Sequence, residues 1–131
     1  MTPLDIANFI TQWLVDYNQR AGTKGFVLGV SGGVDSALTS TLAARTGLPV
    51  LCVEMPIHQS PDQVNRAMNH IDWLKLNHSN VEMESVELTS IFDQFIDAVP
   101  PTGEDTREMA LVNTRARLRM TTLYYFAGLR S

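Results

Sequence analysis

The sequence contains a single cysteine, Cys52, which excludes an internal disulfide, a CxxC redox pair and a zinc site built from cysteines. It has no apolar run of the roughly 20 residues that a membrane-spanning helix needs. Its N-terminus, MTPLDIANFI, lacks the basic start and the continuous apolar stretch of a signal peptide. Basic residues are few, 10 against 14 acidic ones, which argues against a broad nucleic-acid-binding face. We expect a cytoplasmic protein that binds neither membranes nor nucleic acids.

The sequence has 131 residues, an ordinary length for one domain, and 44% of them are hydrophobic. That content is sufficient for a buried core. Apolar residues at helical spacing, together with cap and proline signals, predict five helices. Short apolar runs predict strands between them. We predict strands over residues 26–30, 49–53 and 81–88, and helices over 4–20, 36–44, 60–74, 91–99 and from about 106 to the end. Residues 100–105, Pro-Pro-Thr-Gly-Glu-Asp, predict a loop before the last helix.

Strands that alternate with helices in this way predict right-handed crossovers and a parallel sheet. The class is therefore α/β, with helices on both faces of the sheet. The third strand carries acidic residues on one side, which places it near a sheet edge. Ligands of such sheets bind beyond the carboxyl ends of the strands. The residues that follow the first strand are therefore candidates for a binding site.

The first predicted strand runs directly into the segment Gly29-Val30-Ser31-Gly32-Gly33-Val34-Asp35-Ser36. Two consecutive glycines let backbone N–H groups converge on an anion, and the following helix N-terminus adds positive potential. A carboxylate at Asp35 beside a polyphosphate makes chemical sense when Mg²⁺ lies between them. The segment lacks the lysine of a Walker A loop. The simpler alternative is a glycine-rich turn in which Ser36 caps its helix.

Residues Ser31 to Ser36, SGGVDS, resemble the SGGxDS signature of the N-type ATP pyrophosphatases. Members of that family cleave ATP between the α and β phosphates and pass AMP to an acceptor oxygen. The resemblance implies that the loop binds ATP, with Mg²⁺ held in part by Asp35, and that the ATP-binding residues are Gly29, Val30, Ser31, Gly32, Gly33, Val34, Asp35 and Ser36. Neutral N–H donors and Mg²⁺ would stabilise the charge that develops on the leaving pyrophosphate.

A second informative segment is Asn113-Thr-Arg-Ala-Arg-Leu-Arg-Met120, which belongs to a cluster of four of the ten basic residues. At 100° per residue Arg115 and Arg119 share one helix face, whereas Arg117 points nearly opposite. One ligand therefore cannot engage all three on a regular helix. A solvated basic face, with an arginine packed on a dimer partner, is the plainer interpretation.

Together with SGGVDS, the pattern N-x-x-A-R-x-R-M and the segment CVEMPIHQS at 52–60 resemble the ammonia-dependent NAD synthetases. The resemblance implies a Rossmann-like fold of the adenine nucleotide alpha hydrolase type and a homodimer. It also implies amidation of nicotinate adenine dinucleotide (deamido-NAD) with ATP and ammonia, through an adenylated intermediate and without a catalytic nucleophile. Gln59 would then contact ATP, and the residues implied to bind deamido-NAD are Asn113, Arg117 and Arg119.

Complete members of that family continue into a fourth strand with a G-T-x-x-x-x-E segment, which has no counterpart here. We therefore expect residues 1–131 to form the N-terminal portion of one synthetase domain, truncated after the third strand and the helices that follow it. Two other possibilities remain. The chain could belong to another N-type pyrophosphatase, such as a GMP synthetase or a tRNA-thiolating enzyme, or it could be an inactive nucleotide-binding fragment.

Overall fold

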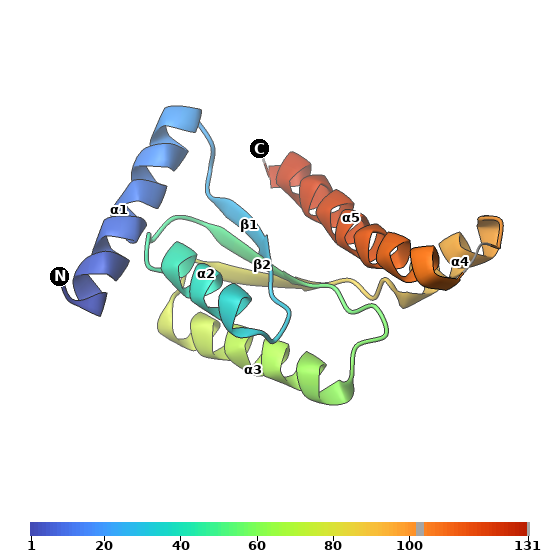
Figure 1. The fold of residues 1–131 in the computed structure, drawn as a ribbon. Helices are drawn as coiled ribbons and strands as arrows, with labels where there is room; N and C mark the ends of the chain where they lie inside the picture. The colour runs from blue at the N-terminus through green and yellow to red at the C-terminus, as the bar shows by residue number, and fades with distance from the viewer. Residues whose placement is uncertain (102–103, 131) are drawn as a thin grey trace.

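The computed structural model describes residues 1–101 and 104–130, in which helices and strands alternate along the chain (Figure 1). The order confirms the predicted α/β class. The helices are α1 (Pro3–Ala21), α2 (Val34–Ala44), α3 (Pro61–Asn77), α4 (Thr89–Ala98) and α5 (Glu104–Arg130); the strands are β1 (Phe26–Gly29), β2 (Val50–Glu54) and β3 (Val81–Ser85). Residues 102 and 103 of the predicted loop lie outside the described residues, and α5 begins at Glu104, within that predicted loop.

The described strands form one parallel sheet in the order β1-β2-β3. Helices α2 and α3 cover one face of the sheet and α5 lies across the other, as Figure 1 shows. Strand β3 is at an edge, and along it Val81 is buried whereas Glu82 and Glu84 are exposed. The sequence predicts both features: helices on both faces of the sheet, and a third strand with one solvent-exposed face.

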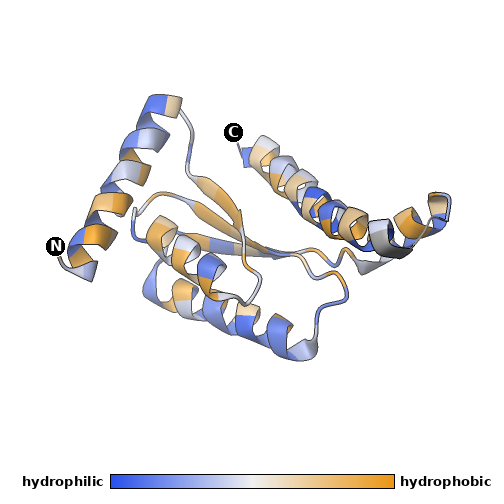
Figure 2. Ribbon diagram, viewed as in Figure 1, coloured by the Kyte–Doolittle hydropathy of each residue, from blue (hydrophilic) through white to orange (hydrophobic). Residues whose placement is uncertain are grey.

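Strand β2 supplies the centre of the core because all five of its residues are buried. Successive side chains of a strand point to opposite faces, so β2 contributes to two clusters. Val50 and Cys52 pack with residues of α2 and α3, whereas Leu51 and Val53 pack with residues of α4 and α5. Hydrophobic segments accordingly lie in the strands between the helices (Figure 2). This packing holds the carboxyl ends of β1 and β2 in a fixed relation.

Helix α1 has the predicted start but buries less of its apolar surface than the sequence predicts. Thr2 and Asp5 form a reciprocal capping box, which satisfies two backbone N–H groups at the helix start. Helix α1 contacts α2, and Leu14 is half-buried, yet Trp13 and Tyr17 remain 50% and 53% exposed. Hydrophobic periodicity identifies residues on one helix face, but the packed face here is rotated away from both aromatic rings.

None of the helices in the described part of the chain combines the length and the apolar character that crossing a bilayer requires.

Candidate functional site

The segment after β1 forms a tight loop that only glycine permits at one position. Gly32 has a φ of +86°, and a Cβ added there would lie 2.6 Å from the backbone oxygen of Gln63 on α3. An L side chain would meet both conformational strain and a steric clash. Upstream, the Val30 N–H donates to the Val53 carbonyl at 3.0 Å, which ties the start of the loop to β2. The loop is therefore clamped between β2 and α3.

Two serines hold the loop closed from within. The backbone N–H of Ser31 donates to Ser36 Oγ at 3.1 Å, and the two hydroxyl oxygens lie 3.2 Å apart. Gly33 is the N-cap of α2, and no side chain caps that helix. Ser36 itself donates to the Gly33 carbonyl at 3.3 Å, so it does not act as the simple helix cap of the alternative interpretation. The N-terminal amides of α2 remain available to an anion.

Asp35 lies in the first turn of α2 with its side chain exposed to solvent. Its carboxylate makes no hydrogen bond or ion pair with any residue that the structure describes. Magnesium is commonly bound by one or two carboxylates together with phosphate oxygens of the substrate. No group of three or more metal-ligating side chains exists in the described ranges. The residues present thus suit Mg²⁺ carried by a nucleotide, rather than a metal held in a cage of protein ligands.

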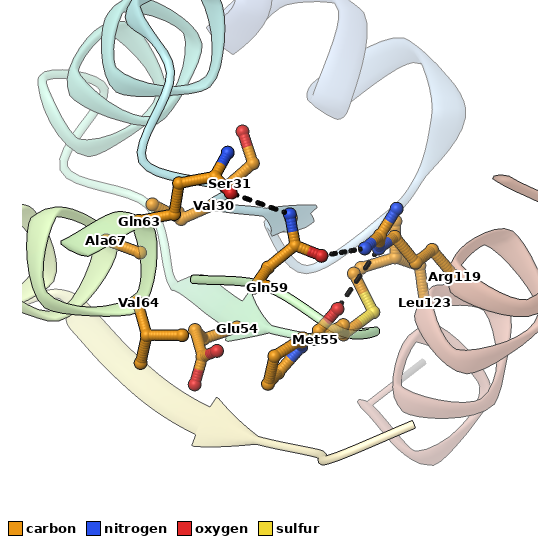
Figure 3. A pocket seen from close by; sticks show the side chains of 12 residues that line it. Val30, Ser31, Glu54, Met55, Gln59, Gln63, Val64, Ala67, Arg119 and Leu123 are labelled. Carbon is orange, nitrogen blue, oxygen red and sulfur yellow. Dashed lines mark hydrogen bonds between the residues drawn. The ribbon is translucent and has the colours of Figure 1, made fainter. Parts of the chain in front are cut away.

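A cavity of about 360 Å³ opens beside this loop, at the carboxyl ends of β1 and β2. That position and size are typical of a small-molecule site in a parallel α/β sheet. Segments from β1, β2, α3 and α5 meet around the cavity (Figure 3). Its lining residues are Gly29, Val30, Ser31, Glu54, Met55, Pro56, Gln59, Gln63, Val64, Ala67, Arg119 and Leu123.

Gln59 and Arg119 join two distant segments across this cavity. The guanidinium of Arg119 donates from Nη2 to Gln59 Oε1 at 2.9 Å and from Nε to the Met55 carbonyl at 3.0 Å (Figure 3). Gln59 Nε2 lies 3.4 Å from Gln63 Oε1, which extends the connection to α3. The structure therefore places two of the predicted site residues, one expected to bind ATP and one expected to bind deamido-NAD, in a single pocket.

Arg119 is a half-buried cation without a carboxylate partner among residues 1–101 and 104–130. Loss of solvent lowers the pKa of its guanidinium, and the charge of nearby Arg115 lowers it further. Arg115 in turn lies over the ring of Phe92, with its guanidinium carbon 5.4 Å from the ring centroid. A cation that lacks a counter-charge and borders a cavity favours an anionic ligand there.

The other two residues predicted to bind the dinucleotide lie elsewhere. Asn113 and Arg117 are exposed on α5, one helical turn apart, and neither lines the cavity that Arg119 borders. The separation of Arg117 from Arg115 and Arg119 agrees with the helical spacing in the sequence. Along with Asn113 and Arg117, the exposed side of α5 carries large apolar residues, among them Met109, Met120 and Tyr124.

Glu54 is a cavity residue that does not stand out in the sequence as a site residue. It ends β2, is only 5% exposed, and accepts a hydrogen bond from the Ser85 hydroxyl at 2.8 Å. Its position in the sequence could have identified it. An acidic residue directly after a buried apolar run stands at the carboxyl end of a strand, where ligands of parallel sheets bind. Gln63 of α3 was missed as well, because helical periodicity does not show which end of a helix approaches a loop.

The chain matches the protein family described as NAD synthase over residues 6–131. It is 37% identical over 124 residues to the NH(3)-dependent NAD(+) synthetase of Pyrobaculum aerophilum, an alignment that covers 92% of this chain and 44% of that protein. The chain thus spans about half the length of the curated relatives it matches.

Two solved structures have the same fold. The NMN synthetase of Francisella tularensis superposes with a TM-score of 0.86 at 28% identity, over 99% of this chain and 52% of that one. The glutamine-dependent NAD+ synthetase of Acinetobacter baumannii, solved in complex with ADP, gives a TM-score of 0.76 at 30% identity, over 95% of this chain and 24% of that one. The family match covers nearly the whole chain, including the SGGVDS loop and the residues that line the cavity. The chain therefore belongs to the NAD synthase family.

Proposed function

We propose that residues 1–131 carry the ATP site and part of the dinucleotide site of an ammonia-dependent NAD synthetase. The observation that carries this proposal is the juxtaposition of the SGGVDS loop with a cavity bordered by Arg119. Among the described residues, no side chain caps the helix that follows the loop, and no carboxylate pairs with Arg119. The proposed reaction joins ammonia to deamido-NAD and consumes ATP, which leaves NAD, AMP and pyrophosphate. Family membership, and the relative solved with ADP, support a nucleotide at this site.

In this proposal the phosphates of ATP rest on the loop from Gly29 to Ser36, and Gln59 contacts the nucleotide from the opposite side of the cavity. The backbone amides at the start of α2 donate to phosphate oxygens. Asp35 would hold Mg²⁺, which when bound neutralises phosphate charge. The clamped loop keeps these donors in place before the nucleotide arrives, so little reorganisation is needed.

Arg119 would bind an anionic group of deamido-NAD or its adenylated form from the α5 side of the cavity. No side chain of the pocket is assigned as a nucleophile. The chain's own residues bind, orient and shield the reacting groups, which is the usual basis of adenylyl and phosphoryl transfer. Ammonia, either free or supplied by another protein, would be the nucleophile.

Asn113 and Arg117 would meet the dinucleotide from the exposed side of α5 in a homodimer. Large apolar residues beside them, Met109, Met120 and Tyr124, give that side the composition of a protein interface. In such a dimer the substrate would lie between α5 and the second copy. The homodimer would accordingly explain why Asn113 and Arg117 lie on one side of α5 and Arg119 on another.

The proposal is tested by incubating the chain with ATP, Mg²⁺, ammonium and deamido-NAD and by separating the products chromatographically. Formation of NAD and AMP in equal amounts would support it. Replacing deamido-NAD with nicotinate mononucleotide tests amidation of a mononucleotide, the alternative suggested by the similarity to an NMN synthetase. Binding of Mg-ATP without any product would agree with a chain that carries the ATP site and only part of the dinucleotide site. Failure to bind Mg-ATP would contradict the proposal.

A further inference from the structure

The carboxylate of Glu54 is buried at the carboxyl end of β2 and, among the residues that the structure describes, has only one side-chain partner. The residue is 5% exposed, and Oε1 accepts the Ser85 hydroxyl at 2.8 Å. No lysine, arginine or histidine pairs with it within the described ranges. A buried carboxylate usually has a cation or several hydrogen-bond donors around it, because it loses the hydration of its charge. Glu54 therefore has acceptor capacity that the described part of its chain does not use.

Glu54 lines the cavity of the candidate site, and its carboxylate lies on the β3 side of the strand end (Figure 3). Protein-built metal coordination does not account for its unused acceptor capacity, since no cluster of three or more ligating side chains occurs among the residues that the structure describes. A carboxylate accepts hydrogen bonds and donates none. The ligand group that complements Glu54 is thus one with hydrogen-bond donors, and a vicinal diol offers two hydroxyls to one carboxylate.

The position of Glu54 relative to the loop selects among such donors. Gly29 of β1 stands in register with Val53 of β2, and the Val30 N–H donates to the Val53 carbonyl. Glu54 follows Val53 at the carboxyl end of β2. The SGGVDS loop begins at the carboxyl end of the adjacent strand β1, so the two lie at the same end of the sheet. In a nucleotide the ribose is joined to the first phosphate through one methylene group. A carboxylate after the second strand, beside a glycine-rich loop after the first, is also how dinucleotide-binding sheets hold ribose hydroxyls.

We propose that Glu54 binds the ribose hydroxyls of the nucleotide whose phosphates lie on the SGGVDS loop, and that Ser85 is a positioning residue for its carboxylate. The inference rests on the proposed ATP site and adds its selectivity for a ribonucleotide over a deoxyribonucleotide. Ser85 orients the carboxylate by donating to Oε1, which leaves Oε2 for the ligand.

The test is calorimetric titration of the full chain with Mg-ATP, Mg-2′-deoxy-ATP, Mg-3′-deoxy-ATP and magnesium pyrophosphate. We expect the unaltered chain to bind at least one deoxy analogue about tenfold more weakly than ATP, the effect of losing a hydrogen bond to a charged group. In Glu54→Gln the loss should appear with ATP itself and the discrimination between ATP and its deoxy analogues should shrink. Pyrophosphate, which has no ribose, should bind both proteins equally.

The unaltered chain alone decides the question if the Gln variant fails to fold. Equal affinity for ATP and both deoxy analogues would overturn the inference while leaving the ATP site intact. Equal weakening of ATP and pyrophosphate in Glu54→Gln would also overturn it, because the loop and not the ribose would then be affected. Failure of the unaltered chain to bind Mg-ATP or pyrophosphate would overturn the proposed function and this inference with it. Ser85→Ala should reproduce part of the lost discrimination without weakening pyrophosphate binding.

Discussion

Arg119 of α5 donates a 2.9 Å hydrogen bond to Gln59, 60 residues earlier in the chain, and this bond spans the candidate pocket. Gln59 follows β2, whereas Arg119 lies midway along the last helix. We expect Gln59→Ala to leave the guanidinium with only the Met55 carbonyl as a partner, and to lower the free energy of unfolding by about 1 kcal/mol. Affinity for Mg-ATP should fall as well.

Chemical denaturation and calorimetry of Gln59→Ala measure these two effects. Gln12→Ala is the matched control, because Gln12 donates to Asp16 on the exposed surface of α1, away from the pocket. The control should change neither quantity beyond about 0.5 kcal/mol. Unchanged Mg-ATP affinity in Gln59→Ala would remove this residue from the site.

Gly32→Ala should distort the SGGVDS loop. The substitution combines a φ of +86° with a Cβ 2.6 Å from the Gln63 carbonyl oxygen. We expect a loss of about 2 kcal/mol or more in unfolding free energy and a marked loss of Mg-ATP affinity. Gly47→Ala separates the two causes, because Gly47 has a φ of +76° but open space around its Cβ position. It should cost about 1 kcal/mol and leave ATP binding intact; equal effects of the two substitutions would argue against the clamped loop.

Asp35→Asn tests the proposed magnesium contact. It removes an exposed charge next to the loop and preserves the size of the side chain. Affinity for ATP in the presence of Mg²⁺ should fall about tenfold, and affinity in excess EDTA should change little or rise, since one negative charge near the phosphates is gone. Asp62→Asn is the control, because Asp62 occupies the first turn of α3 in the same manner. A loss that is the same with and without Mg²⁺ would contradict the assignment.

Arg119→Ala and Arg117→Ala should separate the two sides of α5. Arg119 borders the cavity and Arg117 is exposed on another side of the helix, although both changes remove one positive charge. We expect the Arg119 variant to lower deamido-NAD affinity in calorimetry by about tenfold, whether or not the chain dimerises. The Arg117 variant should weaken deamido-NAD binding only where analytical ultracentrifugation detects dimers. Equal loss of deamido-NAD affinity in both variants under monomeric conditions would refute this division.

The buried thiol of Cys52 should make the free energy of unfolding depend on pH in the alkaline range. Burial raises the pKa of its thiol from 9.0 to about 11. The unfolded chain therefore loses this proton at a lower pH than the folded chain does, and the stability present below pH 9 declines as the pH rises from about 9 toward 11. Urea unfolding at several pH values should show a steeper decline for the unaltered chain than for Cys52→Ala, which has no thiol to titrate. Parallel pH profiles would show that the thiol is not protected.

Much of the fold could be predicted from the sequence because its signals are local. Apolar runs gave the three strands, and caps such as Thr2 and Ser60 gave helix starts that the structure confirms. The extent of burial along α1 was harder to predict, since Trp13 and Tyr17 have the periodicity of core residues and remain half-exposed. Periodicity shows which side chains share a face; the docking of α1 against α2 determines which face is covered.

The candidate site was predictable only in part. The SGGVDS loop is continuous in sequence, so its backbone chemistry can be inferred from its residue types. Helical spacing separated Arg117 from Arg119, but only the packing of α5 shows that Arg119 is the one on the cavity side. Glu54 and Ser85 meet because β2 and β3 pair in parallel with these residues in register. Such pairing is set by the tertiary fold and cannot be deduced from either strand alone.

The central claim, that the loop from Gly29 to Ser36 holds the nucleotide phosphates beside the Gln59–Arg119 pocket, is tested most directly by mapping amide chemical shifts in an isotopically labelled chain during titration with Mg-ATP. We predict saturable shifts at the loop, around Glu54 and Gln59, and near Arg119, with no comparable change at the opposite end of the sheet around Arg45 and Asn77. Saturable shifts confined to that opposite end, or a spectrum unchanged by Mg-ATP, would contradict the account.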